Sequence, residues 1–162
     1  MTIKVSSSMM FAGAAGLALV IVIASFVPGP YAAVVTPGAA GSAQFQGARL
    51  DPAAVKLLQR ACQNCHSQDT EWPLYSKLAP VSWMIRKDVS EGRKFLNFSQ
   101  WSDYGANGQS QLLALSADQI RSGAMPPQRY LILHPEAKLS DSEKTILFDA
   151  MGRESQELLR RH

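Results

Sequence analysis

The chain has 162 residues, which is enough for one domain of ordinary size and a short additional segment. Hydrophobic residues make up 46% of it and charged residues 18%, proportions that fit a globular protein and exclude collagen-like and intrinsically disordered classes. The formal charge at pH 7 is only +3 and no block of like charges occurs, so the sequence does not indicate nucleic acid or an anionic membrane surface as a partner.

Residues 9–27 ("MMFAGAAGLALVIVIASFV") are apolar and uncharged, and Lys4 precedes them. A helix of this length would be about 28 Å long, close to the thickness of a bilayer's hydrocarbon core. We therefore expect residues 9–27 to form a single transmembrane anchor or an uncleaved signal. Cleavage stays an alternative, because small residues ("TPGAAGSA") follow the apolar segment. Lys4 and the amino terminus favour a cytoplasmic position for residues 1–8, with the remainder of the chain across the membrane.

Residues 28–50 carry three prolines, four glycines and no acidic residue. This Pro/Gly/Ala-rich composition is typical of a linker that tethers a folded domain. The domain itself is expected at residues 51–162, because helical patterns begin at residue 51.

The first helix of this domain is predicted to begin at Asp51, an N-cap residue followed by a proline. Spacings of 3, 4 and 3 then place four residues on one helical face: Val55, Leu58, Cys62 and Cys65. A second helix is predicted around residues 81–96 ("VSWMIRKDVSEGRKFL"), where apolar residues again share a face.

Two capping-box patterns predict two further helices. One begins at Ser116 and opens a short helix that Gly123 ends, and the other begins at Ser140 and opens a longer helix to about Leu159. The apolar stripe of this last helix is formed by Ile146, Leu147, Ala150, Met151 and Leu158. No run alternates long enough for a convincing strand, although "YLIL" at residues 130–133 comes nearest. The sequence therefore predicts an all-α, loop-rich domain, with its chemistry between the first and last helices.

Residues 61–67 ("ACQNCHS") contain both cysteines and one of the three histidines, and three ordinary interpretations of the motif are weak. A thioredoxin-type dithiol belongs at the start of a helix among strands, whereas Cys62 comes late in its predicted helix. A structural zinc site needs four ligands, and the chain has no second C-x-x-C pair. A disulfide between these two cysteines would close a very small loop and add little stability.

The fourth interpretation, covalent attachment of a c-type haem, is the one for which C-x-x-C-H is typical. Residues three apart lie together on a helical surface, so the sulfurs of Cys62 and Cys65 can both reach the vinyl groups along one side of a porphyrin. His66 is one residue further round and can point toward the iron. Haem c is attached outside the cytoplasm, which agrees with the predicted membrane anchor.

A haem that only carries electrons usually has a second axial ligand, and methionine is the usual partner of histidine in cytochromes c. Met84 and Met151 have helical periodicity and are most simply core residues. Met125 stands instead in the loop "SGAMPPQRY", where two prolines restrict the backbone after it, so it is the favoured distal ligand. His134, which also precedes a proline, is the alternative distal ligand; Met84 and an open site stay open as well.

Five motifs stand in order along the chain: "CQNCHS", "WPLYSKLAPVSW", "VSEGRKFLNFSQW", "SGAMPP" and "Y..LHPEAKLS". In this order they resemble a bacterial family of small single-haem c-type cytochromes described as a haem-binding domain. The resemblance covers about residues 51–150, nearly the whole predicted domain. It implies thioethers at Cys62 and Cys65, His66 as proximal ligand of the haem iron and Met125 as distal ligand. It also implies a cytochrome c-like fold around one haem.

The resemblance further implies a set of residues that build or border the haem pocket: Trp72, Tyr75, Trp83, Arg93, Asn97 and Trp101. The three tryptophans could on physical grounds be ordinary core residues. Arg93 could bind a haem propionate through its paired donors, or it could be an arginine of the helix surface.

We therefore expect a membrane-anchored mono-haem cytochrome c that transfers one electron and is not an enzyme, since no catalytic constellation accompanies the motif. Its place is expected to be the bacterial inner membrane, with the haem domain on the periplasmic side and unidentified redox proteins as partners. The alternatives are a peroxidase-like or gas-binding haem protein whose sixth position is open or displaceable, and a haem subunit of a larger membrane complex.

Overall fold

The computed structural model describes residues 7–29, 31 and 44–161 of the chain. These residues form helices, turns and loops without a single strand, which confirms the all-α prediction for the described part. Most of the predicted cytoplasmic segment (residues 1–8) and more than half of the predicted linker (residues 28–50) lie outside the described residues.

The chain divides into two compact units, which are treated separately here. The first unit consists of Met1–Thr36 and Glu71–Glu91, and the second consists of Pro37–Thr70 and Gly92–His162. The boundary at residue 91 falls inside one helix, α4, which is shared between the units.

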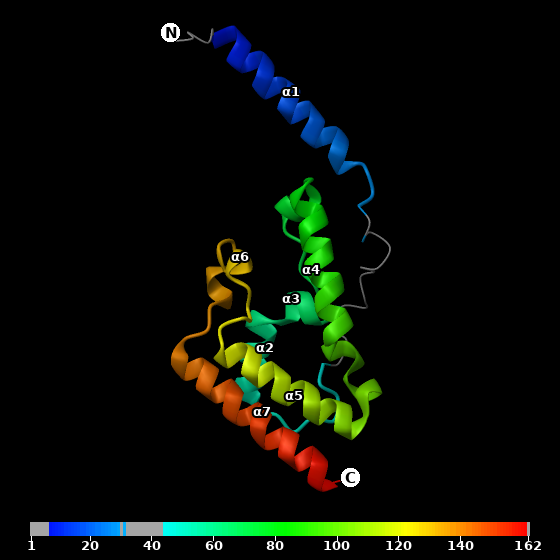
Figure 1. The fold of residues 1–162 in the computed structure, drawn as a ribbon, viewed down its shortest axis with the longest axis vertical. Helices are drawn as coiled ribbons and strands as arrows, with labels where there is room; N and C mark the ends of the chain where they lie inside the picture. Colours follow the sequence, from blue (N-terminus) through cyan, green and yellow to red (C-terminus); the bar gives the residue numbers. More distant parts are fainter. Residues whose placement is uncertain (1–6, 30, 32–43, 162) are drawn as a thin grey trace. The chain divides into compact units, whose positions relative to one another are not determined.

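The described residues of the first unit form α1 (Ser7–Ser25), η1 (Leu74–Lys77) and the larger part of α4 (Val81–Phe95). α1 and α4 are labelled in Figure 1. The Ser25 hydroxyl donates to the carbonyl oxygen of Ile21 at 2.7 Å and accepts from the backbone N–H of Ala79 at 3.1 Å. The Arg86 guanidinium lies 5.7 Å from the centre of the Trp72 ring, a cation–π contact. α4 agrees with the helix predicted around residues 81–96.

Within the described residues, no helix combines the length and the apolar character that crossing a membrane requires. The transmembrane helix predicted at residues 9–27 therefore has no support from the structure.

The second unit contains the remaining helices. They are α2 (Pro52–Ala61), α3 (Gln63–His66), η2 (Phe98–Tyr104), α5 (Gly105–Arg121), α6 (Gln128–Leu131), η3 (Pro135–Ala137) and α7 (Asp141–Arg161). The "YLIL" segment is therefore not a strand, since α6 and the turn that follows it occupy these positions.

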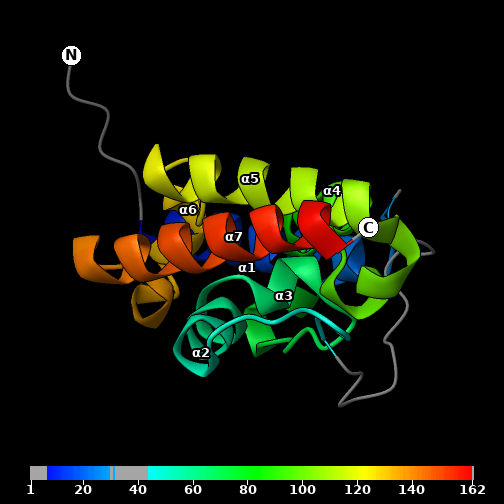
Figure 2. The ribbon, with the colours of Figure 1, turned by 90° about the horizontal axis from the view of Figure 1, so that it is seen from below.

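The long helices α5 and α7 pack side by side and run antiparallel (Figure 1). The Ser110 and Ser155 hydroxyls are 2.8 Å apart, and the Arg121 guanidinium lies 5.0 Å from the centre of the Phe148 ring further along the pair. On its other side α7 packs against α2, so that α7 lies between the two helices (Figure 2). The first and last helices of the predicted haem domain are thus in contact.

A single hydrophobic core joins these helices to η2 and to the segment that precedes α2. Its largest fully buried apolar side chains are Leu58, Trp101, Leu147 and Met151. Met151 is thus the core residue that its helical periodicity predicted. Met84, by contrast, is 57% exposed on α4, so the core position predicted for it is wrong.

Two of the three predicted helix starts are confirmed, those at Asp51 and Ser140, where a loop leads into the helix. The Asp51 carboxylate accepts from the backbone N–H of Ala53 at 2.8 Å at the start of α2. At the start of α7, the Glu143 carboxylate accepts from the Ser140 backbone N–H at 2.8 Å. The helix start predicted at Ser116 is wrong, because α5 passes through this position without a break and the Ser116 hydroxyl donates to the Leu112 carbonyl at 2.7 Å.

Candidate functional site

The cysteine motif forms one tight turn at the end of α2. The backbone leaves the helical conformation at Cys62 (φ −126°, ψ −27°) and re-enters it in the short helix α3. The backbone N–H groups of Cys65 and His66 both donate to the Cys62 carbonyl, at 3.2 Å and 3.0 Å. The prediction that Cys62 and Cys65 share one unbroken helical face is therefore wrong. The two cysteines nevertheless lie on the same turn, one at its start and one near its end.

The two cysteines are not joined by a disulfide, and Cys62 is a poor thiolate. Burial, with the neighbouring Cys65 as a smaller cause, raises the pKa of the Cys62 thiol to about 12. A redox dithiol and a zinc-binding thiolate both need the opposite shift. Within the described residues, no three His, Cys, Asp or Glu side chains group closely enough to hold a metal ion. The raised pKa of Cys62 weighs against the dithiol and zinc interpretations.

The His66 imidazole has a defined tautomer. Its Nδ1 lies 3.0 Å from the Leu96 carbonyl oxygen, and because a carbonyl can only accept, Nδ1 carries the proton. Burial lowers the pKa of His66, although backbone hydrogen bonds with Leu96 and Gly92 partly oppose this effect. The neutral ring therefore keeps its Nε2 lone pair for a metal, and the Phe98 ring stacks on it with 5.7 Å between ring centres.

α4 approaches the cysteine turn at a glycine. A Cβ atom added to Gly92 would lie 2.8 Å from the Cys65 carbonyl oxygen, a distance that real Cβ atoms do not adopt. A side chain at this position would therefore push the C-terminal end of α4, which belongs to the second unit, away from the turn. The glycine also lets the next residue, Arg93, reach the chain that follows the histidine.

Arg93 fixes the loop after His66. Its Nε donates to the Ser67 carbonyl at 2.8 Å, and its Nη2 donates to the Thr70 hydroxyl at 2.9 Å. The Thr70 hydroxyl in turn donates to the Asn64 carbonyl, between the two cysteines, at 2.6 Å. These contacts give Arg93 a role in shaping the motif, whereas its predicted contact with a haem propionate stays a prediction.

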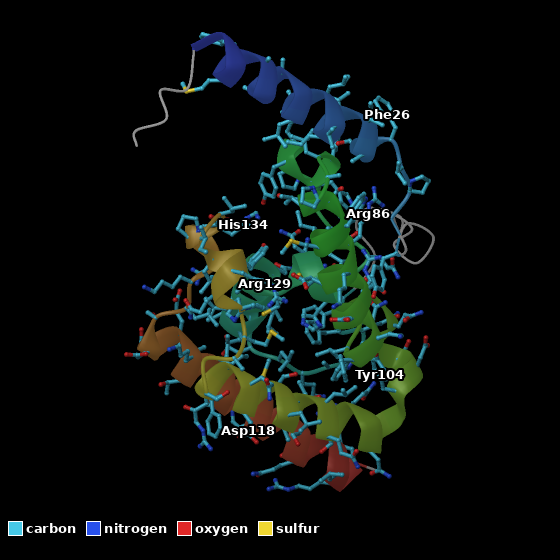
Figure 3. The ribbon with its side chains drawn as sticks, turned by 45° about the horizontal axis from the view of Figure 1, so that its top comes forward. Phe26, Arg86, Tyr104, Asp118, Arg129 and His134 are labelled. Atoms are coloured by element: carbon cyan, nitrogen blue, oxygen red, sulfur yellow. The ribbon has the colours of Figure 1, made fainter. Side chains whose placement is uncertain are left out.

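A second contact holds the turn from α6. The Asn64 side-chain amide donates to the Tyr130 hydroxyl at 3.0 Å, and the Tyr130 ring stacks on His134 with 4.2 Å between ring centres. His134, which follows α6 (Figure 3), has its Nδ1 2.9 Å from the Glu136 carboxylate. The histidine offered as alternative distal ligand is therefore already engaged on one nitrogen and one ring face.

Met125, the favoured distal ligand, lies in the loop between α5 and α6. Gly123 ends α5 there with φ +75°, and the backbone N–H of Met125 donates to the Gln119 carbonyl at 3.1 Å. The Met125 side chain is 37% exposed, whereas Pro126 beside it is buried. The loop is thus anchored at its backbone while the thioether stays outside the core.

The other predicted pocket residues divide between the two units. Trp72, Tyr75 and Trp83 belong to the first unit, so their place around a haem stays a prediction. Asn97, in the second unit, is buried and caps η2 by accepting from the Ser99 N–H at 3.1 Å.

Trp101, also in the second unit, is a core residue, with its ring centre 5.3 Å from that of Phe45. Its buried indole N–H finds no partner among the described residues, an arrangement that an acceptor on a bound group would relieve.

Several residues of the site escape sequence reasoning. Thr70 and Tyr130 hold Asn64, and the Leu96 carbonyl orients His66. A backbone carbonyl carries no side-chain signature, so only the fold identifies this last group. The glycine of "SEGRKF" is the one signal that could have been used, since Gly92 marks a close approach of two backbones.

The donor set fits a haem. Two cysteines that form no disulfide flank one turn, a neutral imidazole behind them keeps one nitrogen for a metal, and a buried indole N–H lacks an acceptor among the described residues. Together with the all-α fold, these features describe a haem protein. The chain belongs to the haem-binding domain family, whose family model matches residues 19–152. No curated protein and no solved structure matches the chain.

Proposed function

We propose that the protein is a mono-haem c-type cytochrome that carries single electrons. The observation that carries the proposal is the hydrogen bond from His66 Nδ1 to the Leu96 carbonyl, which keeps Nε2 available one residue after Cys65. In this proposal Cys62 and Cys65 hold one haem by thioether bonds, and His66 is the proximal ligand of its iron. The bound haem would supply the one-electron chemistry itself, through its iron.

The residues around the motif would keep the ligand geometry constant. Arg93 and Thr70 fix the loop and the Asn64 carbonyl, and Leu96 fixes the imidazole plane. An electron carrier benefits from such rigidity, because a ligand set that does not rearrange lowers the cost of each transfer. No described residue beside the motif is needed as an acid, a base or a nucleophile, so we propose that the protein is not an enzyme.

Met125 is the proposed distal ligand. Met125 is not part of the hydrophobic core, and its loop is held by the Gln119 carbonyl and the buried Pro126. His134 stays the alternative distal ligand, because Glu136 engages its Nδ1 and leaves Nε2 for a metal, as Leu96 does for His66. Methionine and histidine together are the axial pair that raises the potential of cytochromes c.

The proposal extends to location and partners. Haem c is attached outside the cytoplasm, so we place the haem domain on the periplasmic side of the bacterial inner membrane, with redox proteins as its partners. Residues 9–27 would retain the domain there as an anchor, alone or within a larger membrane complex. Carbonate extraction of membranes, followed by measurement of the protein's intact mass, tests this. Release of the full-length chain by carbonate would contradict anchoring.

Carbon monoxide tests the carrier function itself. The reduced full-length protein should keep its spectrum when carbon monoxide is added at neutral pH, because both axial positions are filled. The protein should be reduced and reoxidised reversibly by one electron. The spectra recorded at each potential should be the same during reduction and during reoxidation. Prompt binding of carbon monoxide would favour the peroxidase-like or gas-binding alternative instead.

A further inference from the structure

One peptide group connects His66 to Tyr104. The carbonyl of the peptide between Leu96 and Asn97 accepts from His66 Nδ1 at 3.0 Å. The N–H of the same peptide, which belongs to Asn97, donates to the Tyr104 hydroxyl at 2.8 Å. Tyr104 and His66 therefore bind opposite ends of a single amide.

The two hydrogen bonds strengthen each other through amide resonance. When the N–H donates to an acceptor, electron density moves toward the carbonyl oxygen, and that oxygen becomes a better acceptor for the imidazole N–H. Such cooperative strengthening amounts to about 10–30% per bond. A stronger bond at Nδ1 makes the imidazole a stronger donor at Nε2, the nitrogen left for a metal.

The surroundings keep this arrangement in place. Leu96 and Asn97 are 9% and 2% exposed, so water does not compete for the amide. Tyr104 stands at the junction of η2 and α5 (Figure 3), and its ring packs edge-on against Trp101 with 6.2 Å between ring centres. The Asn97 side chain fixes the same turn by donating to the Gln100 side-chain carbonyl at 3.0 Å.

We propose that Tyr104 is a positioning residue that sets the donor strength of His66 through the Leu96–Asn97 peptide, and so lowers the reduction potential of the haem that His66 binds. The inference rests on the proposed ligation by His66. A more electron-rich imidazole favours the oxidised iron, so loss of the Tyr104 hydroxyl raises the potential.

The test compares the full-length holoprotein with its Tyr104→Phe variant, which keeps the ring and removes the acceptor. In the reduced variant, the His66 Nδ1–H resonance should move upfield and exchange with solvent several-fold faster, and the reduction potential should rise. Ser102→Ala is the matched control, because it removes an exposed hydroxyl from η2 whose hydrogen-bond partner among the described residues is Asp103, at 3.4 Å. The control should change none of these quantities.

The outcomes separate the inference from the function on which it rests. If the wild-type His66 ring shows no resonances shifted by iron ligation, the proposed function fails. If ligation is seen but Tyr104→Phe keeps the wild-type Nδ1–H shift and potential, the role of Tyr104 is overturned. Should Tyr104→Phe not fold, 3-fluorotyrosine at position 104 keeps the shape with a weaker, neutral acceptor. This substitution must then also raise the reduction potential, or the proposal is overturned.

Discussion

Gly92 and Cys65 are so close that their backbones touch: a Cβ atom on Gly92 would stand 2.8 Å from the Cys65 carbonyl oxygen. The contact brings the C-terminal end of α4, from Gly92 on, against the cysteine turn and aligns Arg93 with the chain after His66. The carbonyl of Gly92 also accepts the backbone N–H of Leu96, whose own carbonyl holds the imidazole. One glycine thus connects three groups of the proposed haem site.

Gly92→Ala should therefore damage both stability and haem loading. The backbone of Cys65 cannot yield as a flexible side chain would, so overpacking should cost about 1–3 kcal/mol of unfolding free energy. Denaturant unfolding and the ratio of haem absorbance to protein absorbance measure the two effects. Gly152→Ala is the control: it lies within α7 with open space around it, and alanine there should stabilise by about 0.5–1 kcal/mol. Equal stability of the two variants would refute the close contact.

Met125→Ala should create a binding site for carbon monoxide in the reduced protein, because the mutation removes the proposed distal thioether. Met84→Ala removes the thioether of a residue that is 57% exposed on α4 and should leave the spectrum unchanged. If instead His134→Ala opens the site while Met125→Ala does not, the distal ligand is His134 and our assignment is wrong. Absorption spectra with and without carbon monoxide distinguish these results.

Cys62 should react slowly with alkylating reagents in the folded protein without haem. Its pKa is raised to about 12, so at pH 8 it holds about a thousandfold less thiolate than an ordinary cysteine. Because only the thiolate reacts, the rate should rise about tenfold per pH unit between pH 8 and pH 10. Peptide mapping after timed iodoacetamide treatment measures this rate, with the denatured chain as control. Equal rates for Cys62 in the folded and denatured chains would contradict the prediction.

The start of α7 should lose stability in acid. The Ser140 N–H and then Arg60 lower the pKa of Glu143 from its ordinary value of 4.5. Since the folded pKa is below the unfolded one, the carboxylate's contribution is fully present above pH 4.5 and disappears as the pH falls through the folded pKa.

Glu143→Gln should therefore lower stability at neutral pH and flatten the acid side of the stability profile, as followed by circular dichroism. Asp149→Asn, an exposed carboxylate on the same helix, is the control. An acid profile of Glu143→Gln that is as steep as that of the wild type would show that Glu143 does not contribute.

Local signals in the sequence predicted the helices well where local chemistry decides them. Asp51 and Ser140 cap their helices because the chain enters from a loop, and their side chains satisfy backbone groups that nothing else reaches. Ser116 carries the same pattern but lies within a longer helix, because packing of α5 on α7 continues through it. A capping box cannot reveal that the preceding turn is already helical.

The site was predictable only at its C-x-x-C-H motif. C-x-x-C-H marks Cys62, Cys65 and His66 by type and spacing, but the break at Cys62 depends on tertiary contacts. Arg93 appeared as a candidate propionate partner, whereas its observed partners are the Ser67 carbonyl and Thr70. Residue types do not show which backbone carbonyl or which distant hydroxyl contacts the motif. The roles of the Leu96 carbonyl and the Tyr104 hydroxyl are therefore visible only in the fold.

Covalent attachment of haem to the cysteine turn is the central claim, and intact mass combined with a pyridine haemochrome spectrum tests it most directly. The full-length protein from membranes should carry the mass of one haem after denaturation, with the spectrum of a haem bound by two thioethers. Cys62→Ser and Cys65→Ser should each shift that spectrum toward a haem with one remaining thioether. A denatured wild-type chain without added haem mass, or a haem that acidified solvent extracts, would contradict the account.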